Sequence, residues 1–123
     1  MRRLIHERTP LDDRLESGLE RRFLKLTRSA GLPPPEAQYE VRDGGVVARL
    51  DFAYPSLRLG IEVDGYRYHA GKARWERDLE RRNWLESRGW RILNITWAQL
   101  REKPGGVVSL LRCFFPDQGS LFA

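Results

Sequence analysis

The stretch from residue 50 to residue 69 constrains the fold more than any other part of the chain. It reads Leu-Asp-Phe-Ala-Tyr-Pro-Ser-Leu-Arg-Leu-Gly-Ile-Glu-Val-Asp-Gly-Tyr-Arg-Tyr-His, with two apolar runs on either side of Tyr54, Pro55 and Ser56. Proline presets the backbone dihedral that a turn needs and cannot donate to a sheet ladder. The two runs therefore predict a β-hairpin that turns at Pro55.

Three carboxylates lie in these apolar runs, at Asp51, Glu62 and Asp64. A carboxylate is costly to bury unless it meets a cation or a donor, so their convergence indicates a site rather than a core. The hairpin brings Asp51 near Glu62 or Val63. Strand alternation puts Glu62 and Asp64 on one face and turns Val63 to the other. Because Mg²⁺ takes one or two carboxylates with waters and substrate phosphates, the hairpin predicts a divalent-cation site.

The 123 residues suit one domain with a single core and contain no apolar stretch long enough to cross a membrane. The opening residues carry charge but lack the apolar segment of a signal peptide, so we expect a cytoplasmic location and no membrane partner. The net charge of +5 and the pI of about 9.9 favour a polyanionic partner.

The cysteine count excludes two kinds of structural support. Cys113 is the one cysteine, so no internal disulfide can form, and the two histidines, His6 and His69, stand at unrelated spacings. Structural zinc sites need four such ligands in recognisable clusters. We therefore expect no structural zinc.

Residues 1–10 show no periodic pattern and predict a mobile basic arm or the remnant of a longer parent protein. A single domain is expected over residues 11–115. Residues 116–123 resemble a frayed tail.

A helix is predicted from Leu11 to the glycine at Gly31. Its apolar residues recur at helical spacing, at Leu15, Leu19, Phe23, Leu26 and Ala30. Glu20 lies on the shoulder of this apolar stripe. It either reaches a site at the edge of the sheet or is a surface glutamate that pairs with a neighbouring arginine.

A three-stranded antiparallel meander is predicted next. Residues 38–42 and 46–53 flank the turn signal Asp43-Gly44-Gly45, and residues 57–63 add the third strand. A helix over residues 72–88 and a strand over 90–96 follow. A right-handed crossover makes that last strand parallel to the third. The sequence thus predicts an α/β fold of αβββαβ order, with a mixed four-stranded sheet flanked by helices.

Charged residues share the predicted apolar face of the second helix. Projection at 3.6 residues per turn puts Asp78 and Arg82 on one face with Trp75, Leu79 and Leu85, and Trp84 on the opposite side. Asp78 and Arg82 either form a buried ion pair or lean towards the site. Trp84 is then exposed or covered by the C-terminal helix.

Basic residues surround the predicted site in sequence, with Tyr66 and Tyr68 between them. They are Arg67, Lys72, Arg74, Arg77 and Arg81. Such residues contact phosphates and sugars and position a duplex without reading its bases. A solvated helix face explains the last three equally well.

Several motifs together resemble a known family. They are Leu-Glu-Arg-Arg-Phe, Leu-Pro-Pro-Pro, Leu-Asp-Phe-Ala-Tyr, Ile-Glu-Val-Asp-Gly with a histidine four residues later, Glu-Arg-Asp and Gly-Trp-Arg-Ile-Leu. In this order, over about residues 17–100, they resemble domain of unknown function 559. That family is similar to very-short-patch-repair endonucleases and belongs to the PD-(D/E)XK nuclease superfamily.

The resemblance assigns roles to individual residues. Asp51 matches the metal-binding aspartate and Glu62 the second acidic ligand, and the backbone carbonyl of Val63 is expected to join them on one cation. Asp64 stands where the motif has lysine, which is a departure from the pattern. His69 matches the histidine on which the repair endonucleases rely, and its alternative is a loop histidine bonded to backbone. The cysteine ligands of their zinc are missing here.

The sequence therefore predicts a Mg²⁺- or Mn²⁺-dependent DNA endonuclease, with nicking as one form of the activity. His69, with an unperturbed pKa of about 6.5, would accept a proton from the attacking water. The alternative is a nuclease-derived DNA-binding module without turnover, which Asp64 keeps open. A pure protein-interaction domain would leave Asp51, Glu62 and His69 unexplained. Duplex DNA is the expected partner, with a homodimer or attachment to a larger parent protein left open.

Overall fold

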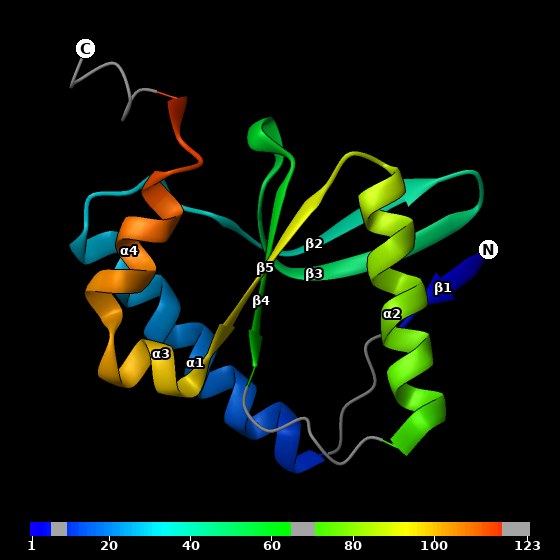
Figure 1. Ribbon diagram of the computed structural model, residues 1–123, viewed down its shortest axis with the longest axis horizontal. Coiled ribbons are helices and arrows are strands. Elements are labelled where there is room, and N and C mark those ends of the chain that lie inside the picture. Colours follow the sequence, from blue (N-terminus) through cyan, green and yellow to red (C-terminus); the bar gives the residue numbers. More distant parts are fainter. Residues whose placement is uncertain (6–9, 65–70, 117–123) are drawn as a thin grey trace.

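The computed structural model describes residues 1–5, 10–64 and 71–116, without the side chains of residues 10–16, 64, 71 and 74. A twisted five-stranded sheet crosses the molecule between two groups of helices (Figure 1). Helices α1, α3 and α4 lie on one side and α2 on the other. In chain order the elements are β1 (Arg2–Leu4), α1 (Pro10–Ser29), β2 (Glu36–Asp43), β3 (Val46–Tyr54), the 3₁₀ turn η1 (Pro55–Leu57), β4 (Leu59–Asp64), α2 (Gly71–Ser87), β5 (Arg91–Thr96), α3 (Trp97–Glu102) and α4 (Pro104–Arg112).

The predicted strand directions are confirmed. β2, β3 and β4 form an antiparallel meander, and η1 turns the chain at Pro55 as the proline predicted. β5 runs parallel to β4, from the pair Leu59 and Arg91 to the pair Asp64 and Thr96. The crossover through α2 therefore brings the carboxyl ends of β4 and β5 to one edge of the molecule.

The sheet has five strands rather than the four that we expected. The fifth is β1, which lies in the segment predicted to be a mobile arm and pairs in parallel with the start of β3. Leu4 is buried with Val41 and Ala48. A strand of three residues is too short for its side-chain alternation to be recognised in the sequence. Its extended conformation depends on its pairing with β3. The domain bounds at residues 11 and 115 stay a prediction.

Two apolar clusters hold the layers together. The α1 cluster packs α1, α3 and α4 on the sheet, and Phe23 meets Phe52 with ring centroids 5.0 Å apart. The α2 cluster packs α2 on the other face through Leu50, Leu85 and Trp90. Each side of the sheet thus has its own apolar layer.

The structure corrects the predicted apolar face of α2. Trp75 and Leu79 are 59% and 38% exposed, whereas Leu85 is fully buried. Trp84 packs partly buried against the α2 cluster and not under the C-terminal helix. The helical projection treats every apolar side chain as part of the core, whereas Trp75 and Leu79 in the first half of α2 are exposed to solvent.

Gly60 lets β4 pass close beneath Leu50. A Cβ atom at Gly60 would lie 2.8 and 2.9 Å from the Leu50 methyl carbons and 3.0 Å from Ile92 Cδ1. We expect Gly60→Ala to destabilise by about 1–3 kcal/mol through overpacking and Leu50→Ala by about 2–5 kcal/mol. The double variant should cost less than their sum, because the added methyl occupies part of the cavity.

Urea unfolding of the three variants measures these differences. Gly18→Ala is the matched control, because a Cβ there meets nothing within 4 Å. It should stabilise α1 by about 0.5–1 kcal/mol. Additive losses in the double variant would contradict the close contact.

Candidate active site

The site forms where one edge of β3 is interrupted. β2 pairs along one edge of β3, while β1 takes residues 46–48 of the other edge and β4 takes residues 52–54. Residues 49–51 lie in the gap between β1 and β4. The Gly45 carbonyl accepts from the Arg2 N–H at 2.7 Å, so alternate residues after it, Arg49 and Asp51, direct their backbone groups to the same edge.

Side chains fill this gap. The Asp51 N–H donates to Glu62 Oε2 at 3.3 Å, and the Arg49 carbonyl accepts from Arg81 Nη2. Buried backbone groups need such partners, since an unpaired one costs about 1–3 kcal/mol. Glu62 and Arg81 thus replace the ladder bonds that a strand would otherwise make here.

Asp51 and Glu62 face one another across the hairpin, as the sequence predicted. The Val63 N–H donates to Asp51 Oδ2 at 2.9 Å, so each carboxylate accepts from the backbone of the other strand. Both are 2% exposed. The hairpin therefore holds two carboxylates side by side in the interior of the protein.

Arg81, a residue of α2, offsets the negative charge of this buried pair. Its Nη1 lies 2.5 Å from Glu62 Oε1, and the residue is 3% exposed. The sequence predicts that Arg81 contacts nucleic acid or lies on a solvated helix face, and both alternatives are wrong because the residue is buried. The signal in the sequence is its position four residues before the buried Leu85, on the same side of the helix.

The electrostatics of Glu62 follow from this burial. Burial raises the pKa of the Glu62 carboxyl above its usual range. The charge of Arg81 lowers that pKa in part, while Asp51 raises it. A second cation beside the two carboxylates would further favour the ionised form of Glu62.

The side chains of β3 stop alternating regularly between the two faces of the sheet at Asp51. Ala48 and Leu50 belong to the α2 cluster, but Phe52 and Tyr54 belong to the α1 cluster, although simple alternation would put all four on one face. Asp51 stands at this break. The break lets a polar side chain occupy the middle of a strand that is buried on both sides.

The neighbouring strand β2 is also irregular at this level, at Gln38. The register between β2 and β3 passes from Ala37 to Tyr39, and Gln38 has a φ of 54° in the left-handed region. Its side-chain amide donates to Glu20 Oε1 at 3.3 Å. Glu20 thus reaches from α1 to the part of β2 that lies opposite Asp51.

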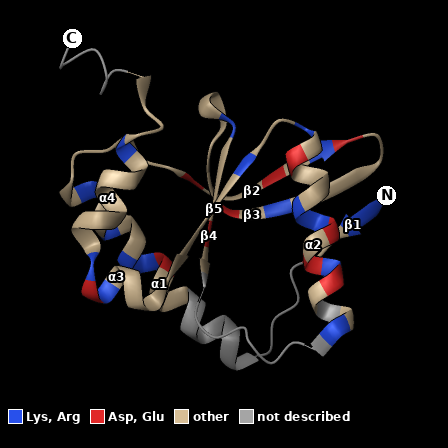
Figure 2. Ribbon diagram, in the orientation of Figure 1, with Lys and Arg blue, Asp and Glu red and all other residues tan. Residues whose placement is uncertain are grey.

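The other predicted residues fall in three groups. His69, Arg67, Tyr66 and Tyr68 lie outside the described residues. Asp64 and Arg74 are described by their backbone alone, in β4 and α2. Lys72 and Arg77 are exposed on α2, and Asp78 and Arg82 are half-buried there. Basic and acidic residues are interleaved along α2 (Figure 2).

The described residues contain no group of three or more histidine, cysteine, aspartate or glutamate side chains with the arrangement of a metal site. Among the described residues, Asp51 and Glu62 therefore form a group of two carboxylates without a third such side chain placed to share a metal ion. Their hard oxygen donors fit Mg²⁺ or Mn²⁺, which needs one or two protein carboxylates. They do not fit a structural zinc site with four protein ligands.

A mixed five-stranded sheet with helices on both faces is a restriction-endonuclease-like fold. The family model REase_MTES_1575, which is restriction-endonuclease-like, matches residues 28–113. The chain belongs to this family.

One solved structure is similar to this fold, and two curated proteins are similar in sequence. The catalytic domain of the homing endonuclease I-Bth0305I superposes with a TM-score of 0.60, covering 80% of this chain and 94% of that one at 21% identity. Two uncharacterized proteins of Mycobacterium tuberculosis, MT2308 of strain CDC 1551 and Rv2248 of strain H37Rv, are each 39% identical over 95 residues. The match covers 76% of this chain but 35% of the length of each relative.

Within the described ranges, the helices are all too short or too polar to cross a membrane.

The buried pair predicts a strong energetic coupling. Arg81→Met should destabilise the protein by about 3–5 kcal/mol, because Glu62 would stay buried without its counter-ion. Arg81→Met combined with Glu62→Gln should be more stable than Arg81→Met alone, since the uncompensated charge is then gone. Urea unfolding of the single and double variants measures the coupling.

The control is an exposed pair on the same helix. Lys72 Nζ lies 4.0 Å from Glu76 Oε1, and both side chains are mostly exposed. Lys72→Ala should change stability by no more than about 0.5 kcal/mol. An Arg81→Met effect as small as this one would contradict the role of Arg81 as the counter-ion of Glu62.

Proposed function

We propose that the protein is a metal-dependent endonuclease that hydrolyses phosphodiester bonds of duplex DNA, nicking one strand, in the manner of very-short-patch-repair endonucleases. The observation that carries the proposal is the buried pair of Asp51 and Glu62, which face each other across a hairpin at an interruption of the sheet. The family is restriction-endonuclease-like, and the structural neighbour is the catalytic domain of a homing endonuclease.

Asp51 and Glu62 would hold one Mg²⁺ or Mn²⁺, with the backbone carbonyl of Val63 as a further oxygen ligand. When bound, such an ion activates a water and offsets negative charge on the phosphoryl oxygens. The chain itself contributes the fixed position of the carboxylates. A backbone N–H group orients one oxygen of each carboxylate, which fixes the position of the pair.

Arg81 is proposed as a positioning residue. The superfamily motif has lysine where this chain has Asp64, and the cation beside Glu62 comes instead from α2. By holding Oε1, Arg81 fixes the rotamer of Glu62 and offsets one of the two negative charges. The remaining charge at the site attracts a divalent ion.

The role of His69 follows from the resemblance, and those of Glu20, Asp78 and Arg82 follow from their places on the helices. His69 would accept the proton of the attacking water at neutral pH. Glu20 and Asp64 would add negative charge at the rim of the site, and Asp78 and Arg82 would support it from α2.

Lys72, Arg74 and Arg77 of α2, with Arg67, would contact the phosphates. These contacts position the duplex and carry no sequence information. Arg81 is not among them, because it is buried on Glu62.

A catalytically inactive DNA-binding module is the second candidate. It is favoured by the ion pair itself, since Glu62 Oε1 already has a cationic partner. Because the chain spans about a third of the length of its curated relatives, attachment to a larger protein is proposed beside a homodimer as the functional assembly. The proposed location is the cytoplasm, and the proposed pathway is DNA repair.

A plasmid nicking assay with Mg²⁺ or Mn²⁺ tests the activity. Asp51→Asn should abolish nicking, because it removes a charged metal ligand, and His69→Ala should slow it by about 10²–10⁴-fold. Glu36→Gln, which neutralises an exposed carboxylate at the start of β2, is the control and should nick at the parent rate.

Duplex binding without metal separates the two candidates. Asp51→Asn should bind as well as the parent or slightly better, because one repulsive charge is gone. Binding without any nicking in the parent would establish the module instead of the enzyme. Nicking by Asp51→Asn at the parent rate would exclude this carboxylate pair as the catalytic centre.

A further inference from the structure

Two arginines from different elements lie over one indole ring. Arg22 of α1 has its Cζ 4.7 Å from the ring centroid of Trp97, and Arg101 of α3 has its Cζ 5.8 Å from the same centroid. Arg22 is exposed, Arg101 has 57% of its side chain exposed, and Trp97 is half-buried. The indole therefore gathers two positive charges at the surface.

This arrangement leaves donors for an anion. A cation–π contact uses the face of the guanidinium and leaves its N–H groups, five on each arginine, directed outwards. Glu102 lies 3.5 Å from Arg101, and both side chains are mostly exposed, so this pair is weak. Two guanidinium groups near one ring also repel each other. An anion between them would relieve that repulsion.

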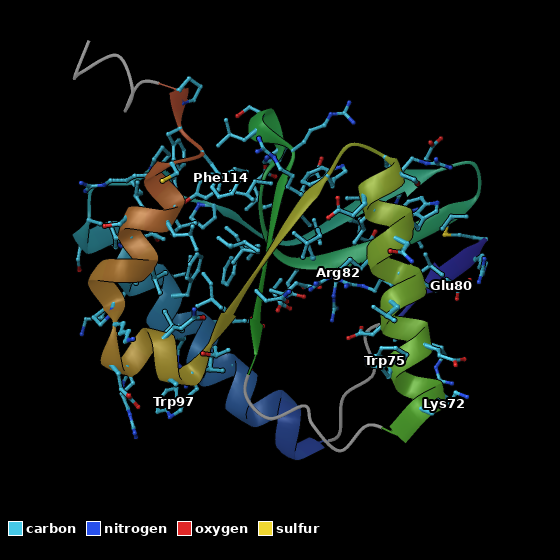
Figure 3. All side chains as sticks on the ribbon, viewed as in Figure 1. Lys72, Trp75, Glu80, Arg82, Trp97 and Phe114 are labelled. Atoms are coloured by element: carbon cyan, nitrogen blue, oxygen red, sulfur yellow. The ribbon has the colours of Figure 1, made fainter. Side chains whose placement is uncertain are left out.

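The three residues lie at the same edge as the carboxylate pair. Trp97 directly follows Thr96, which is the Cα partner of Asp64, and two positions earlier Asn94 is the partner of Glu62. Figure 3 shows Trp97 and Lys72 at the lower border of the molecule, on opposite sides of the end of β4. Basic groups therefore lie on both sides of the end of β4.

We propose that Arg22 and Arg101, held by Trp97, form a second phosphate-binding surface for duplex DNA. This inference rests on the proposed function and extends it. The backbone of the duplex would lie across the carboxyl ends of β4 and β5, with Lys72 and Arg77 on one side and the Trp97 group on the other. Contacts on both sides would hold a phosphodiester over Asp51 and Glu62.

The chain contains a matched control for this group. Arg91 has its Cζ 5.0 Å from the ring centroid of Phe114, so it too is an exposed arginine on an aromatic ring. It stands at the other end of β5, paired with Leu59. Arg91 and Thr96 are five residue steps of about 3.3 Å apart, so they lie about 16.5 Å from each other along the strand.

Fluorescence anisotropy with a labelled duplex, in EDTA and over a salt titration, tests the proposal. The parent should lose affinity as salt rises, because bound phosphates release counter-ions. Arg22→Ala and Arg101→Ala should each reduce the slope of log affinity against log salt by about 0.9. Arg22→Lys should restore most of the slope, and Arg91→Ala should match the parent.

The outcomes separate this inference from the proposed function. A parent that does not bind the duplex would overturn both. Binding that Lys72→Ala or Arg77→Ala weakens, but that neither Arg22→Ala nor Arg101→Ala changes, would overturn the second surface alone. An equal loss in Arg91→Ala would overturn its location, because net charge would then explain the effect. Melting temperatures of all variants verify that each is folded.

Discussion

The ion pair between Glu62 and Arg81 is the interaction on which the centre of this structure depends. It bonds the backbone of β3 where neither β1 nor β4 reaches, and it connects α2 to the central hairpin. Two buried charges cost much to desolvate, and their attraction compensates for this only with good geometry and further hydrogen bonds. Here the further bonds go to the Asp51 N–H and the Arg49 carbonyl. The same pair therefore gives hydrogen-bond partners to backbone groups of β3 and holds a carboxylate at the candidate site.

The interruption of the sheet also explains how Asp51 can stand in a strand that is buried on both faces. Side-chain alternation breaks there, and Gln38 on the neighbouring strand takes a left-handed φ at the same level. A regular strand would have aimed position 51 into an apolar layer. The left-handed residue and the break in alternation are thus the local conditions that allow a polar centre here.

The sequence was sufficient for the parts of the fold that depend on local chemistry. The turn at Pro55 and the alternation of β4 placed Asp51 opposite Glu62, and the crossover rule gave the parallel β5. Arg81 lies at helical spacing from the buried Leu85, but its partner is a carboxylate distant in sequence, which periodicity does not detect. Trp75 is the opposite case, because it is an apolar residue on the predicted core face that is 59% exposed. β1 is too short to carry a pattern at all.

β1 has a consequence for how the protein meets other chains. A strand with an open edge offers unpaired N–H and C=O groups on which a second polypeptide can add a strand. By pairing with residues 46–48, β1 closes that part of the edge of β3, and the two side chains of the ion pair close the part beyond it. The three residues of β1 therefore cover a stretch of β3 that would otherwise be an open edge of the sheet.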